Sequence, residues 1–201
     1  MALGNTKDTY GCVSRAIHWL TVALLIGAFT LAWTDVIGIH KSVGVAILGV
    51  ALARIAWTAI QPGVGALGNL PRWQHVAAKA THGLLLLWLA AMPLTGWAMS
   101  SAFGRPVSFF GLFSLPMLTD PDRALGRQLH EVHETLASVG LALIALHVAA
   151  ALWHHFVVKD ATLARMLPCR LANCACGGAP RAVGADVPRR DGDAGGCCGG
   201  R

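Results

Sequence analysis

Four long apolar stretches, separated by short polar or Gly- and Pro-containing segments, dominate the pattern along the chain. They cover residues 16–34, 39–60, 76–99 and 129–157. A helix needs about 20 mostly apolar residues to cross the hydrocarbon core of a bilayer. The pattern therefore predicts an all-α membrane protein, a bundle of four transmembrane helices, with Pro93 as a kink in the third span.

Lys7 and Arg15 precede the first apolar stretch, as basic residues also precede the core of a signal peptide. This stretch is longer than the usual 7–15 residues of such a core, and no A-x-A cleavage site follows it. We expect it to be retained as the first transmembrane helix.

Composition supports a membrane class. Hydrophobic residues make up 55% of the chain and charged residues 13%, whereas soluble domains have about 45–50% and about 25%. The net charge of +6 could suggest nucleic acid, but the basic residues form no stripe with interleaved aromatics. They gather at the ends of the apolar runs, so we expect membrane lipid and no nucleic acid as the partner.

Lys and Arg also set the orientation, because cytoplasmic loops carry an excess of them. With the N-terminus in the cytoplasm, twelve basic residues lie inside or at the inner edge and four lie outside. The inner ones are Lys7, Arg15, Arg54, Arg72, Lys79, Lys159, Arg165 and five in the tail; the outer ones are Lys41, Arg105, Arg123 and Arg127. Both termini are therefore expected in the cytoplasm.

Two segments outside the spans stand out. The longest connection, residues 100–128, contains "GRPVSFFGLFSLPML", apolar enough to lie on the membrane surface or to cap the bundle. After Pro168 the chain is rich in Gly, Arg and Cys with little to bury, which predicts a transmembrane domain 1–168 and a disordered tail 169–201. The tail cysteines match no standard zinc motif, and metal binding, acylation and an inert tail all stay open.

Histidines and one arginine recur at a helical spacing inside the spans. His133 and His147 are fourteen residues apart, close to four turns or about 21 Å, so they share one face at two depths. His40 and Arg54 have the same separation on a span that runs the other way. An outer layer of His40 and His133 results, and an inner layer of His147 with Arg54, which His18 joins from the first span.

Two imidazoles that face each other across a bundle core suit the iron of a haem with two axial histidines. Arg54 would pair with a haem propionate, which explains an arginine at that depth. Small residues next to the histidines would admit the flat macrocycle: Ala137 and Gly140 on the fourth span and Gly44 on the second. A transported or regulatory transition metal is the alternative.

The other histidines have ordinary interpretations. His82 and His75 could hydrogen-bond a neighbouring helix, although His82 lies at the inner level and could touch a haem edge or a quinone. His154 and His155 are expected in the interfacial zone. His130 with Glu131 and Glu134 would form an outer metal site, but "HEVHE" is not the H-E-x-x-H zinc pattern.

At these residues the chain resembles the prokaryotic cytochrome b561 family, small four-helix inner-membrane proteins with two haems. The matching pieces are "SRAIHWLTVALLIG", "IHKSVGVAILGVALARIAW", "THGLLLLWLAAMPLTGWAMSSAFGRPVSFFGLF" and "LHEVHETLASVGLALIALHVAAALWHHFVVKDATLARMLP". The resemblance implies two b-type haems, with iron bound by His18 and His147 in the inner one and by His40 and His133 in the outer one.

The resemblance also implies a function. Members of the family carry electrons between a periplasmic-side donor and the quinone pool, and some oxidise superoxide and reduce ubiquinone, so an enzymatic activity stays open. Lys41, with Arg105 and Arg127, could steer an anionic donor to the outer face. Two alternatives remain: a cytochrome b anchor subunit for a dehydrogenase or hydrogenase partner, and a non-redox membrane protein that binds or transports a metal.

Overall fold

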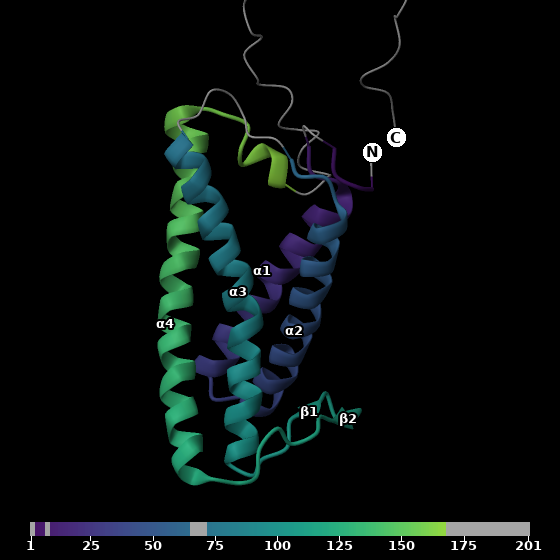
Figure 1. The fold of residues 1–201 in the computed structure, drawn as a ribbon, viewed down its shortest axis with the longest axis vertical. Helices are drawn as coiled ribbons and strands as arrows, with labels where there is room; N and C mark the ends of the chain where they lie inside the picture. Colours follow the sequence, from purple (N-terminus) through teal and green to yellow (C-terminus); the bar gives the residue numbers. More distant parts are fainter. Residues whose placement is uncertain (1–2, 7–8, 65–71, 168–201) are drawn as a thin grey trace, which may run out of the picture.

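The fold is a bundle of four long helices, seen in a computed structural model that describes residues 3–6, 9–64 and 72–167 (Figure 1). The helices are α1 (Cys12–Trp33), α2 (Ile37–Ile60), α3 (Arg72–Ala102) and α4 (Arg123–Trp153). All four are long and apolar enough to cross a membrane. The prediction of a four-helix membrane protein is confirmed.

The helices extend beyond the apolar stretches. α1 begins at Cys12, four residues before the predicted span, and α4 begins at Arg123, six residues before it. Asp122 caps α4, since its carboxylate accepts hydrogen bonds from the amides of Ala124 (2.8 Å) and Leu125 (3.3 Å). Hydropathy marks the part of a helix that suits hydrocarbon, whereas caps and backbone bonds set where the helix ends.

Neighbouring helices pack in chain order: α1 against α2, α2 against α3, and α3 against α4 (Figure 1). The buried core draws residues from α1, α2 and α3, and α3 continues as a helix through Pro93. The core residues are Ala28, Val43, Ile47, Ala51, Trp88 and Leu89.

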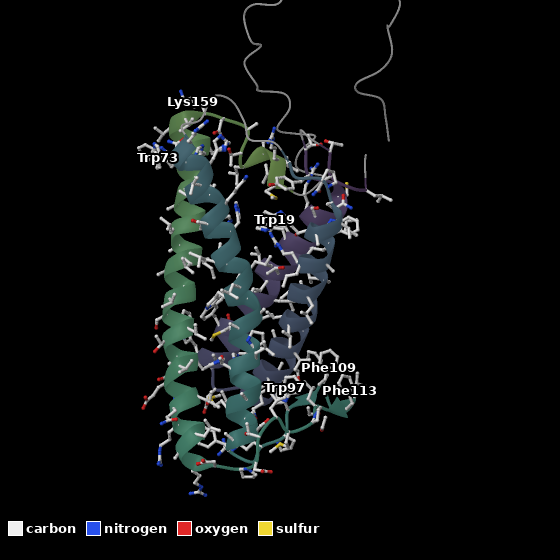
Figure 2. All side chains as sticks on the ribbon, in the orientation of Figure 1. Trp19, Trp73, Trp97, Phe109, Phe113 and Lys159 are labelled. Atoms are coloured by element: carbon white, nitrogen blue, oxygen red, sulfur yellow. The ribbon has the colours of Figure 1, made fainter. Side chains whose placement is uncertain are left out.

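The long outer connection contains a small hairpin that the helical pattern did not predict. Strands β1 (Ser108–Phe109) and β2 (Phe113–Ser114) pair antiparallel. Ser42 of α2 fastens the hairpin, because its hydroxyl donates to the carbonyl of Ser108 (2.9 Å) and accepts from the amide of Phe110 (3.0 Å). The connection thus caps the outer ends of α2 and α3, and Phe109 and Phe113 are seen there in Figure 2.

At the inner end the chain turns back over the bundle. One π-helical turn (His154–Val158) follows α4, and residues 159–167, here called the strap, then cross to α1 with a 3₁₀ turn at Ala164–Met166. The indole of Trp19 donates to the carbonyl of Met166 (2.8 Å). The tail from residue 168 on, with the disorder and the cysteine chemistry considered above, lies outside the described residues.

Candidate functional site

The outer layer brings His40 of α2 and His133 of α4 within electrostatic range of each other. Nδ1 of His40 lies 2.9 Å from the main-chain carbonyl oxygen of Ala28 on α1. Nδ1 of His133 lies 3.1 Å from the hydroxyl oxygen of Thr95 on α3. Each outer imidazole is therefore oriented by a helix other than its own.

These contacts set the tautomer of both outer rings. The carbonyl of Ala28 can only accept, so Nδ1 of His40 donates to it. The Thr95 hydroxyl donates to the carbonyl of Met92 (2.8 Å), so its oxygen accepts from Nδ1 of His133. Both rings then keep a lone pair on Nε2, which is the form in which histidine binds a metal while its other nitrogen is held.

Gly96 lets the ring of His133 lie against the backbone of α3. A Cβ at this position would stand 3.1 Å from Cε1 of His133, which is closer than nine in ten such contacts. Sequence reasoning missed both Thr95 and Gly96. The only available signal was that the antiparallel arrangement of the third and fourth spans brings these residues to the depth of His133.

The inner layer brings together three imidazoles from three helices. The ring centres of His18 and His147 are 6.4 Å apart, and those of His82 and His147 are 5.1 Å apart. Imidazole nitrogens bind transition metals at roughly 2 Å, so two rings that share one ion have centres about 6 Å apart. The separation of His18 and His147 suits a shared iron.

Arg54 lies on the inner layer from α2. Its two terminal nitrogens are 3.4 and 3.5 Å from Nδ1 of His18, and because a guanidinium only donates, this ring nitrogen accepts. No carboxylate pairs with Arg54 within residues 3–6, 9–64 and 72–167. An arginine without a carboxylate partner suits an anionic haem propionate. If Arg54 paired with a propionate in place of His18, Nδ1 of His18 could carry the proton of its own ring.

The prediction that Gly140 gives room to a macrocycle is wrong. A Cβ at Gly140 would collide with the indole of Trp88, so this side chain fills the space beside the glycine. Gly44 does border open space, since no atom lies within 4 Å of the place where its Cβ would stand. The sequence showed where small residues lie but not which neighbour takes the space.

Comparison with known proteins now identifies the family. Residues 9–169 match the prokaryotic cytochrome b561 family. The chain belongs to this family. It is a membrane electron carrier. The family confirms the predicted fold class and the predicted character of a haem protein, an electron-transport protein and an oxidoreductase. Haem of b type is the cofactor of the family.

Three curated relatives align over most of both chains. Cytochrome b561 homolog 2 of Escherichia coli (strain K12) is 34% identical over 83% of this chain and 95% of its own length. Cytochrome b561 homolog 1 of the same strain is 32% identical over 77% and 94%. A protein of Yersinia pestis named probable superoxide oxidase CybB is 31% identical over 79% and 96%.

The outer cations differ in their surroundings. The ammonium of Lys41 is half-buried and donates to the hydroxyl of Ser100 on α3 (2.7 Å). Arg105 and Arg127 are exposed. Of the three residues considered for steering an anion, Lys41 thus points into the bundle of this cytochrome, whereas the two arginines face the surroundings.

The remaining histidines lie near the ends of the helices. His75 is half-buried near the start of α3, and His130 is exposed, 3.7 Å from the carboxylate of Glu134. Within the described ranges no group of three or more His, Cys, Asp or Glu side chains has the arrangement of a metal site. The outer site of His130, Glu131 and Glu134 is therefore not formed.

His154 and Asp160 join the π-helical turn to the strap. Nδ1 of His154 lies 2.6 Å from the carboxylate of Asp160, and both side chains are mostly shielded, whereas His155 is exposed. Partial burial acts to raise the pKa of Asp160, but hydrogen bonds from Thr162 and His154 outweigh it and hold the pKa below its ordinary value. Asp160 is therefore ionised at neutral pH.

Proposed function

We propose that this protein holds two b-type haems at two depths and carries electrons across the membrane between them. His40 and His133 would bind the outer iron, and His18 and His147 the inner one. The observation that carries the proposal is the 6.4 Å between the ring centres of His18 and His147, together with two imidazoles at the other end, His40 and His133, that are each held by a neighbouring helix. When bound, each haem supplies a one-electron couple between ferric and ferrous iron.

The donor set favours haem over another metal. A protein site for zinc or a transported metal normally has three or four protein ligands, whereas an axially bound haem needs two. His82 lies close to His18 and His147, but within the described ranges no three such side chains are arranged so that they could hold one metal ion. The two histidine pairs therefore favour haem over the alternative of a non-redox membrane protein that binds or transports a metal.

The protein side chains would hold, orient and neutralise the cofactors. Ala28 and Thr95 keep the proton of each outer imidazole on Nδ1, so that Nε2 keeps a lone pair that would bind the iron. Arg54 would offset a propionate charge in the inner layer. The layers lie about 21 Å apart along α4, which divides the crossing of the hydrocarbon into shorter steps.

For the donor and acceptor we propose superoxide at the outer face and ubiquinone at the inner one. The name of the Yersinia pestis relative supports the donor. Two superoxide ions would give two electrons and become two molecules of oxygen, and one quinone would take these electrons and two protons to become quinol. Since histidine would fill both axial positions of each iron, superoxide would react at a haem edge, with Arg105 and Arg127 attracting it.

For the location we propose the bacterial inner membrane, with both termini in the cytoplasm. The excess of Lys and Arg at the end of the bundle that holds the start of α1 and the end of α4 supports this orientation. Protease digestion of oriented membrane vesicles tests it, because only inside-out vesicles should expose the C-terminal tail.

The central test is a redox titration of purified protein combined with haem quantification. We expect two haems for each polypeptide and a titration with two midpoints. A protein saturated with haem that still holds a single porphyrin would contradict the proposal. A colourless protein, even with haem supplied during expression, would favour the metal-binding alternative.

Partners need separate experiments. Stopped-flow mixing with superoxide should reduce the haems and, when ubiquinone is present, lead to quinol. Haems that stay oxidised under these conditions would exclude superoxide as the donor. A stable additional subunit on purification from native membranes would instead favour the anchor-subunit alternative.

A further inference from the structure

Trp88 of α3 is the largest side chain of the buried core. Its exposed fraction is 5%, and its indole Nε1–H donates to the main-chain carbonyl of Leu136 on α4 at 2.6 Å. The ring rests directly against Gly140, where even one additional carbon would collide with it. The indole is therefore held by a hydrogen bond and by shape against one place on α4.

That place is halfway between the two histidine layers. Gly140 is seven residues from His133 and seven from His147, roughly 10 Å along the axis in each direction. On α3, His82 contacts the inner layer and Thr95 the outer one, and Trp88 lies between them. The indole thus occupies the mid-plane of the bundle between the two sites.

The other buried residues of the core are aliphatic, and Phe29 is among the partly buried residues that pack against them. The other members of the buried core are Ala28, Val43, Ile47, Ala51 and Leu89. None of these offers π orbitals, which reduce the tunnelling barrier between two redox centres relative to saturated side chains. The hydrogen bond to Leu136 also joins the indole to the helix that carries a histidine of each layer.

We propose that Trp88 provides the electronic path between the two haems. The proposal rests on the function proposed above. One electron leaves the reduced centre at one level and reduces the oxidised centre at the other. Trp88 is unchanged at the end of the step, since the indole couples the centres and is itself neither oxidised nor deprotonated. It binds no iron, and its role is to couple the two centres electronically.

The test compares Trp88→Leu and Trp88→Phe with the unchanged protein in vesicles that enclose ferricyanide, with a membrane-impermeant reductant outside. We expect electron flux to fall several-fold in Trp88→Leu and to recover in part in Trp88→Phe, which keeps an aromatic ring. Trp73→Leu is the matched control, because Trp73 is 68% exposed near the inner end of α3. Its flux should equal that of the unchanged protein.

Haem content and both midpoint potentials are measured on every variant. Flux in Trp88→Leu equal to the unchanged protein, with two haems and unchanged potentials, overturns the role of Trp88. A single haem in the unchanged protein overturns the proposed function instead, so the two failures are distinguishable.

A second variant covers the case in which Trp88→Leu does not fold. Gly140→Ala keeps the indole but displaces it, so flux should fall although no aromatic ring is lost. Thermal stability provides a readout that does not depend on electron flow: Gly140→Ala should destabilise the unchanged protein more than it destabilises Trp88→Phe, because the smaller ring relieves the collision. Equal flux in Gly140→Ala and the unchanged protein overturns the proposal.

Discussion

The hydroxyl oxygen of Thr95 lies 3.1 Å from Nδ1 of His133 and thereby joins α3 to α4 at the outer histidine layer. The same hydroxyl donates its own proton to the carbonyl of Met92. It can therefore only accept from His133, which leaves Nε2 of that ring without a proton. A hydroxyl group on α3, which carries no outer histidine, thus leaves His133 in the tautomer that the proposed iron site requires.

Replacing Thr95 with Val should weaken the binding of the outer haem. The substitution preserves the shape of the side chain but removes the hydroxyl that accepts from Nδ1–H of His133, and loss of such a partner typically costs 10–100-fold in metal affinity. Haem titration into apoprotein measures the effect. Thr95→Ser keeps the hydroxyl and should retain near-normal affinity; equal weakening in both variants would show that packing and not the hydrogen bond matters.

Single histidine substitutions should remove the haems separately. His40→Ala or His133→Ala should lose the outer haem and keep the inner one, and His18→Ala or His147→Ala should do the reverse. Because His82 lies 5.1 Å from His147 but outside the proposed pair, His82→Ala should keep both haems. Absorption spectra with haem quantification measure this, and loss of both haems from one folded variant would argue against two separate sites.

Removing the charge of Arg54 should lower the midpoint potential of the inner haem. A nearby cation favours the reduced and less positive centre, and Arg54 has no carboxylate partner in the described ranges. Spectroscopic redox titration of Arg54→Ala measures the shift, while the outer haem should keep its potential. Arg54→Lys retains the charge and should shift the potential less. An inner potential that is the same in all three proteins would exclude a propionate role.

The contribution of Asp160 to stability should depend on pH in one direction. Its pKa is lower in the folded protein than the ordinary value of about 3.9, so the ionised form is the one that folding favours. The stabilisation is fully present above that ordinary pKa and is lost as pH falls through the lower folded pKa. Asp160→Asn should therefore destabilise the strap at neutral pH and have little effect in strong acid.

Thermal unfolding of both proteins across the acidic range measures this difference, and limited proteolysis at Arg165 follows the strap itself. Thr162→Val, which removes one hydrogen bond to the same carboxylate, should have a smaller effect with the same pH dependence. A difference between Asp160→Asn and the unchanged protein that grows on acidification would contradict the assignment.

Much of the architecture follows from properties of single segments. Stretches of apolar residues show which helices cross the membrane because spanning depends on length and composition alone. The depth of His133 and His147 follows from the rise of one helix, and the excess of Lys and Arg gives the orientation used for the proposals. Each of these inferences needs no knowledge of which helix faces which.

Contacts between helices could not be read in this way. Membrane helices are apolar around most of their circumference, so the sequence pattern does not show which face meets a neighbour. Trp88 could have faced lipid, and Gly140 could have bordered a macrocycle; only the packing of α3 on α4 puts one against the other. The hydrogen bonds of His40 and His133 likewise depend on the rotation of two helices each.

The sequence by itself determined four membrane-crossing helices, their order and the two depths at which imidazoles recur, because hydropathy and helical rise act along the chain. Tertiary structure alone decided that Thr95 orients His133, that Arg54 contacts His18 and that an indole separates the layers. These are relations between side chains on different helices, and they are set by helix rotation and register, which arise only when the helices pack.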